Sequence, residues 1–198
     1  DLRILAPRLT SKIRERVGSF VKPPATELHI ERTGKTPGPD PESLGYSLDE
    51  MAGIVVRILQ DIGMVENFPP ILVFFGHGSG SLNNPHESAY NCGACSGGRG
   101  GPNARAFSMM ANDPRVRRKI LERGIELGDD VRFVGAFHNT CNDGVEYYDL
   151  DLLPRTHRSL FRRIEVSVNE TRARNSHERS RRFESAALEL TPAEALEH

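Results

Sequence analysis

The most regular hydrophobic pattern in the chain lies between residues 47 and 63. Apolar side chains recur there at helical spacing, on one face of the segment: Met51, Ile54, Val55, Ile58, Leu59 and Ile62. Ser47 and Glu50 have the spacing of a capping box, and Gly63 stands where a helix commonly ends. The pattern therefore predicts an amphipathic helix that begins after Ser47 and packs against a core.

Two short apolar runs have the composition of strands that are buried on both faces. They are "PPILVFF" (69–75) and "VRFVGAF" (131–137), and each is followed closely by a histidine, His77 or His138. A third segment, "TELHIE" (26–31), alternates like a strand. Helices are predicted over 103–112, from 113 to about 124, and over 156–184, the last with an inner stripe of Leu160, Phe161, Ile164 and Val168.

Alternating strands and helices predict an α/β fold with a Rossmann-like, layered and mainly parallel sheet that is flanked by helices. Residues 1–46 are interpreted as an N-terminal linker and strand region, and residues 47–190 as the α/β domain that carries the chemistry. Residues 191–198 begin with Thr191, Pro192 and Glu194, a helix-start signature. They are expected to be either the start of a cut helix or the remnant of a purification tag, so that the chain is a piece of a longer protein.

The composition argues against some classes of function but does not identify one. The 198 residues are 37% apolar and 27% charged, which suits one substantial core, and the net charge of -1 gives no reason to expect nucleic acid as a partner. Nine arginines between 155 and 182 are interleaved with acids, a pattern more typical of a solvated helix face. No apolar run is long enough to span a bilayer, so the chain is expected to be soluble.

The residues that carry chemistry lie in and around "GHGSGSLNNPHESAYNCGACSGGRGG" (76–101). The carboxyl ends of parallel strands form the reactive crevice of such sheets, so His77 and His138 are both expected there, and the glycine-rich loop returns Cys92 and Cys95 to the same rim. Imidazole and thiolate are ordinary zinc ligands. A histidine at the end of a strand is often only structural, and one CxxC is a weak signal, but His77 together with Cys92 favours a metal site. Cys95 is either a further ligand or a small core thiol.

Four other residues near the loop are candidates for supporting roles. His86 and Glu87, in "NNPHES", are predicted either to orient a metal ligand or to stabilise the turn. Arg99 and Arg105 flank the start of the helix predicted at 103, where an anion such as bicarbonate is favoured, although solvated surface arginines are the commoner case. His138 is either a further metal candidate that lines the crevice or a cap at the end of its strand.

The loop and its surroundings resemble a known family. The block "GHGSGSLNNPHESAYNCGACSGGRGGPNARAF", with "GYSLDEMAGIVVRILQDIG" before it and "FVGAFHNTCNDGVEYYDLD" and "RNSHERSRRF" after it, is similar to the DabA-type inorganic carbon transporter subunits. The resemblance implies a fold like that of β-carbonic anhydrases and a zinc cofactor. It also implies a peripheral position on the cytoplasmic face of the membrane, with a membrane-embedded, proton-channel-like partner and accumulation of bicarbonate from CO2.

In that family, the resemblance implies, zinc is held by a Cys-x-Asp pair from an earlier strand and by a His and a Cys that correspond to His77 and Cys92. No Cys-x-Asp precedes His77, because Cys92 is the first cysteine of the chain. This chain is therefore expected to hold half of the site and to be inactive alone. In the complete site, zinc would lower the pKa of water to roughly 7, so that hydroxide attacks CO2.

Two other classes of function fit parts of the sequence. A strand followed by "GHGS" is also similar to tetrapyrrole metal chelatases, in which the histidine handles the metal during insertion, but these enzymes do not need a "CGAC" loop. The glycine- and asparagine-rich loop is alternatively a non-catalytic module that docks a partner protein.

Overall fold

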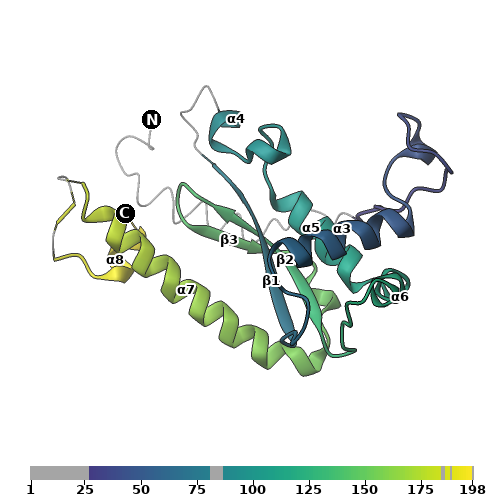
Figure 1. Cartoon of the computed structure of the whole chain (residues 1–198). Helices are drawn as coiled ribbons and strands as arrows, with labels where there is room; N and C mark the ends of the chain where they lie inside the picture. Colours follow the sequence, from purple (N-terminus) through teal and green to yellow (C-terminus); the bar gives the residue numbers. More distant parts are fainter. Residues whose placement is uncertain (1–26, 81–86, 184–185, 188, 198) are drawn as a thin grey trace.

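The structure is a computed structural model, and it describes residues 27–80, 87–183, 186–187 and 189–197. The elements in chain order are α3 (Leu48–Asp61), β1 (Ile71–Gly78), α4 (Glu87–Tyr90), α5 (Gly101–Asn112), α6 (Pro114–Glu122), β2 (Arg132–Asn139), β3 (Gly144–Tyr147), α7 (Arg158–Ser180) and α8 (Pro192–Glu197). They form an α/β arrangement in which helices flank a small sheet (Figure 1).

The sheet has the order β1-β2-β3 and is mixed. β1 and β2 are parallel, whereas β2 and β3 are antiparallel, so the prediction of a mainly parallel sheet is corrected for the described residues. β2 occupies the centre and is buried over residues 133–136, the apolar middle of its sequence. β1 lies at an edge of the described sheet, and Phe75 is 44% exposed, so the prediction of burial on both faces is wrong for β1.

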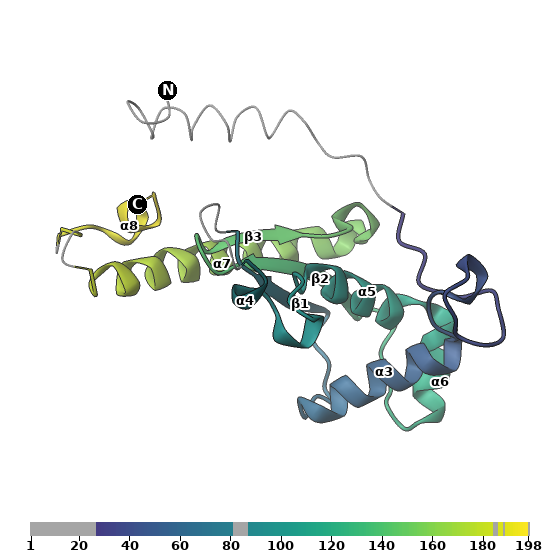
Figure 2. The ribbon, with the colours of Figure 1, turned by 90° about the horizontal axis from the view of Figure 1, so that it is seen from above.

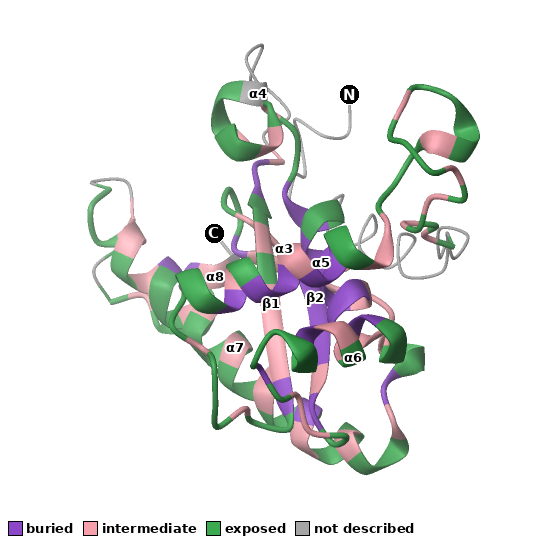
Figure 3. Ribbon diagram, turned by 45° about the vertical axis from the view of Figure 1, so that its right-hand side comes forward, coloured by how far each residue is buried: buried purple, intermediate pink, exposed green. Residues whose placement is uncertain are grey.

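Helices cover both faces of the sheet. Figure 2 shows α7 on one side, with α3 and α6 on the other. The larger apolar cluster joins the inner faces of α3, α5 and α6 to one side of the sheet, and a smaller cluster joins Ile71 and Val134 to Phe161 of α7 on the other side. These buried stretches are purple in Figure 3. Burial of apolar area on each face holds the two layers of helices to the sheet.

The helix-start signals in the sequence are confirmed. Ser47 and Glu50 form the predicted capping box at the start of α3, and Asp113 caps α6. Thr191 and Glu194 form the same reciprocal hydrogen bonds ahead of α8, which packs against α7. Residues 192–197 therefore form a helix that is part of the folded structure.

Two boundaries differ from the sequence prediction. α7 is shorter than the predicted 156–184, because residues 155–157 form a 3-10 turn and the helix ends at Ser180. The segment predicted as a strand at 26–31 lies partly outside the described residues. Over 27–31, only Glu31 forms a bridge, to Tyr46, so the alternation there does not make a strand.

α5 approaches the sheet unusually closely, and glycine permits the contact. A Cβ placed on Gly76 would lie 2.0 Å from the carbonyl oxygen of Gly100, at the start of α5. The amide of Gly100 donates to the carbonyl oxygen of His77 at 2.8 Å. This close backbone contact fixes the end of the 79–100 loop against the carboxyl end of β1.

Candidate metal centre

His77 and His138 lie side by side at the carboxyl ends of two parallel strands. They are direct partners in the β1–β2 register, one pair before the strands end at Gly78 and Asn139. Side chains at paired positions point to the same face of a sheet, so both imidazoles lie on the face covered by α7. The sequence predicted that both histidines follow directly after the strands. In the structure they are the second-last residues of the strands, and they lie at the carboxyl ends as predicted.

The loop that carries the cysteines is tied to this same strand end at two points. Asn91, next to Cys92, accepts a hydrogen bond from the amide of Ser79 at 2.7 Å, and Gly100 binds the backbone of His77. Between these ties, Cys92 pairs with Gly98 in a tight turn that contains the CGAC motif. This hydrogen bond brings Asn91 and Ser79 together although they are 12 residues apart in the sequence. It was not predicted from the sequence.

The two thiols of the turn interact and favour the ionised form of Cys92. The Cys95 thiol donates to the Cys92 sulfur, and the backbone N–H groups of Cys95 and Ala94 also point at it, so the pKa of Cys92 is lowered. The same hydrogen bond raises the pKa of Cys95, whose sulfur also accepts from Asn103 Nδ2 at 3.2 Å. A thiolate stabilised by backbone amides is the form of cysteine that binds metal.

The donors present suit zinc, but they do not complete a site. Within the part of the chain that the structure describes, no group of three or more His, Cys, Asp or Glu side chains is arranged to hold a metal ion. His77 and Cys92 supply one nitrogen and one sulfur donor, whereas a structural or catalytic zinc site takes three or four protein ligands. A zinc site that includes these two residues would need at least one further protein ligand.

His138 is engaged by a buried carboxylate that sequence reasoning missed. Asp143 is 1% exposed, and its Oδ1 lies 3.1 Å from His138 Nε2. The carboxylate also accepts from Arg179, from Asn175 at 3.1 Å and from Ser176 at 3.0 Å, all on α7. Asp143 stands in "NDG" with φ of 52°, so its sequence context indicates only a turn.

The four residues predicted to support the site differ in their surroundings. Arg105 forms a two-pronged ion pair with Asp149, with both contacts at 2.7 Å, so an anion would compete with that carboxylate. The stem of Arg99 lies close to Gly78. An anion site at Arg99 stays a prediction. His86 lies outside the described residues, and Glu87 begins α4, where its side chain is not described.

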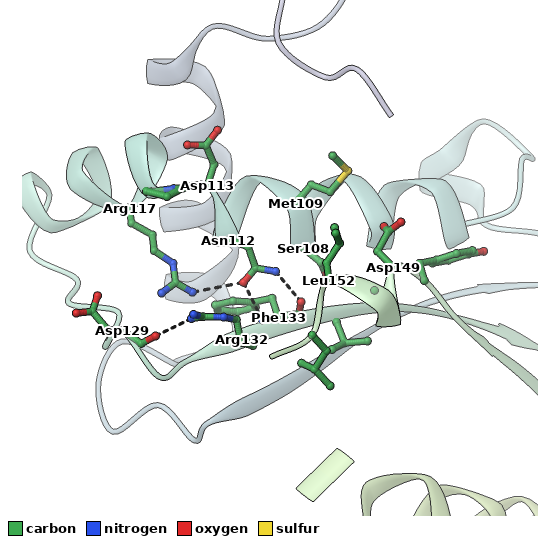
Figure 4. Close-up of a pocket in the computed structure, with 15 residues that line it drawn as sticks. Ser108, Met109, Asn112, Asp113, Arg117, Asp129, Arg132, Phe133, Asp149 and Leu152 are labelled. Carbon is green, nitrogen blue, oxygen red and sulfur yellow. Dashed lines mark hydrogen bonds between the residues drawn. The ribbon is translucent and has the colours of Figure 1, made fainter. Parts of the chain in front are cut away.

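A cavity of about 460 Å³ lies elsewhere, beside the amino-terminal half of β2 (Figure 4). One of its two arginines, Arg117, donates to the backbone carbonyls of Ala111, Gly128 and Val131, and burial lowers its pKa. Asn112 joins Arg117 to the backbone of Phe133. These polar groups satisfy one another, and they tie the start of α6 to the end of α5 and to the start of β2.

Known proteins that are similar to this chain are named as subunits of transporters. The model of the family "Probable inorganic carbon transporter subunit DabA" matches residues 2–198, so the chain belongs to this family. A relative from Rhodopirellula baltica, "Probable inorganic carbon transporter subunit DabA 2", is 80% identical over 99% of the chain. Relatives with the corresponding names from Sorangium cellulosum (DabA 2) and Methylococcus capsulatus (DabA) are 40% and 39% identical, each over 99% of the chain.

The match covers a small part of each relative. The chain spans 18% of the Rhodopirellula and Methylococcus proteins and 19% of the Sorangium protein. No solved structure gives a significant match to the chain. In the described residues, no helix combines the length and apolar character that crossing a bilayer requires.

Proposed function

We propose that this chain contributes half of a zinc site to an inorganic carbon transporter subunit that converts CO2 to bicarbonate. The observation that carries the proposal is the anchoring of the cysteine loop on the end of β1. The Asn91–Ser79 and Gly100–His77 hydrogen bonds hold the loop that carries Cys92 at the strand end that carries His77. Zinc is the metal that this nitrogen and sulfur pair suits.

Each residue of the chain has a defined part in this proposal. His77 and Cys92 hold the metal, and the Cys95 thiol together with the Cys95 and Ala94 amides lowers the pKa of the Cys92 thiol. Zinc, when bound, makes water acidic enough to supply hydroxide near neutral pH. A Cys-x-Asp pair elsewhere in the full-length protein provides the other ligands, so this chain alone is inactive. The complete site has the Rossmann-like layering of β-carbonic anhydrases.

The proposed partner protein and the proposed cellular location of the subunit are based on the family, and the chemistry of the site does not bear on them. The relatives are named as subunits, and the proposal assigns them a membrane-embedded, proton-channel-like partner. The subunit lies on the cytoplasmic face of that membrane, where bicarbonate accumulates. Proton flow through the partner makes hydration one-way.

The direct test uses the full-length protein with its membrane partner. Cys92→Ser and His77→Ala are expected to lower zinc from about one equivalent to below about a tenth and to abolish inorganic carbon uptake, because each removes a ligand. Cys141→Ser is the matched control, since Cys141 contacts Ser79 and lies outside the CGAC turn. A protonophore is expected to stop uptake by the wild type.

Each alternative class of function predicts a different result. Unchanged zinc in Cys92→Ser would contradict the proposal and favour a chelatase-like histidine. Uptake that persists after the proton gradient collapses would contradict the coupling. A metal-free His77→Ala protein that retains normal uptake with its partner would show that the loop serves docking instead.

A further inference from the structure

A second cavity, of about 330 Å³, opens on the face of the sheet that carries the His77 side chain. Two neighbours of His77 line it. Phe75 is two positions earlier on β1, and therefore on the same face, and His138 is the register partner of His77 on β2. The cavity is thus adjacent to the proposed metal ligand, although His77 does not line it.

The opposite wall of the cavity comes from one stripe of α7. Val168, Thr171, Arg172 and Asn175 have the i, i+3, i+4, i+7 spacing of a single helix face. Nearer the start of α7, this face is apolar and packs on the sheet through Phe161 and Ile164. Beyond Val168 it becomes polar, at the level of the strand ends where the two histidines lie. A stripe that faces the sheet ordinarily stays apolar, so the change indicates a polar site.

Arg172 is the unusual member of this wall. Its Nε donates to the backbone carbonyl of Asp143, and its Nη1 donates to Asn169 Oδ1 at 2.9 Å. Both acceptors are uncharged, and no carboxylate pairs with Arg172 in the described part of the chain. By contrast, Arg174 pairs with Glu170 on the exposed side of the helix, and Arg182, just beyond the end of the helix, pairs with Glu178.

The nearby carboxylate does not neutralise this cation. Asp143 already accepts hydrogen bonds from four side chains, namely those of His138, Asn175, Ser176 and Arg179. Its negative charge is matched by Arg179, which leaves the charge of Arg172 in excess at the cavity wall. The apolar side chains of Phe75, Val145 and Val168 line the cavity beside Arg172 and provide no acceptor for its guanidinium group.

From these contacts we infer that the cavity between β1, β2 and α7 binds a small oxyanion on Arg172, and that this oxyanion is bicarbonate. Guanidinium groups suit planar oxyanions because two N–H donors match two oxygens. The inference rests on the proposed function, because the position beside His77 makes the cavity a compartment for the product. Asp143 also lines the cavity, and its two carboxylate oxygens are engaged by His138, Asn175, Ser176 and Arg179.

The test measures the affinity of the full-length protein with its membrane partner for bicarbonate, as the Kd from a titration at fixed pH. Arg172→Gln is expected to raise this Kd about tenfold or more, the effect of losing one charge-assisted hydrogen bond, with the zinc content unchanged. Arg172→Lys keeps the charge and is expected to recover part of the loss. Arg174→Gln, on the exposed side of the same helix, is the control and is expected to leave the Kd unchanged.

Three outcomes separate this inference from its rivals. If both Arg172 variants keep the bicarbonate Kd of Arg174→Gln while zinc stays near one equivalent, the anion site is wrong and the metal site stands. Lower thermal stability with an unchanged Kd would contradict the inference, because Arg172 would then pair with a carboxylate of another part of the protein. A raised Kd in a protein that binds no zinc would support the anion site and refute the proposed metal chemistry.

Discussion

Asp143→Ala is expected to lower the free energy of unfolding of the chain by about 2–4 kcal/mol. The carboxylate is almost fully buried and holds four side-chain donors, so its removal leaves the buried Ser176 hydroxyl without its acceptor and Arg179 with only the Thr140 carbonyl. It also releases His138, the only strand residue among the four. Urea denaturation followed by circular dichroism measures the change.

Two further variants make this prediction specific. Asp143→Asn keeps the shape but presents an amide donor to a set of donors, so it is expected to recover only part of the stability. Asp61→Ala removes an exposed carboxylate that pairs with Arg57 within α3 and is expected to cost less than about 0.5 kcal/mol. Equal stability of Asp143→Ala and Asp61→Ala would show that the network around Asp143 does not hold α7 to the sheet.

Gly76→Ala is expected to destabilise the chain by about 3 kcal/mol or more, because the new methyl group meets backbone atoms that cannot move aside independently. Its Cβ would lie 2.0 Å from the Gly100 carbonyl oxygen and 2.7 Å from the Gly101 nitrogen. The start of α5 must then shift away from β1, and the cysteine loop shifts with it. In the full-length protein, the variant is therefore also expected to lose zinc.

The control for this prediction lies in the same loop. A Cβ on Gly93 would meet nothing within 4 Å, so Gly93→Ala is expected to leave stability and zinc content close to those of the wild type. Thermal unfolding and metal analysis of the two variants measure the difference. A Gly76→Ala protein as stable as Gly93→Ala would contradict the close contact between α5 and β1.

Local signals in the sequence predicted much of the fold. The capping box of Ser47 and Glu50 fixed the start of α3, and Asp113-Pro114 fixed the start of α6, because a helix start depends on neighbouring residues. β3 was missed, since four residues with one antiparallel partner have little pattern of their own. The edge position of β1 was also missed, because apolar composition does not reveal how many neighbours a strand has.

The candidate site was predictable only where residue types carry chemistry by themselves. His77, Cys92, Cys95 and His138 could be proposed as candidates from the strand ends and the CGAC motif, and their role in a metal site stays a prediction. Asp143 and Arg172 could not, because their roles depend on contacts between a turn and a helix about 30 residues later in the chain. The sequence does contain one indication of this site, because the inner stripe of α7 changes from apolar to polar after Val168. That change can be interpreted only when it is known that this stripe faces the sheet.

The central claim is that the His77 imidazole and the Cys92 sulfur bind one zinc ion. X-ray absorption at the zinc edge of the full-length protein tests it most directly. The account predicts sulfur at about 2.3 Å and nitrogen at about 2.0–2.1 Å from the metal, with less sulfur scattering in Cys92→Ser and less imidazole scattering in His77→Ala. A zinc spectrum that neither substitution changes would contradict it.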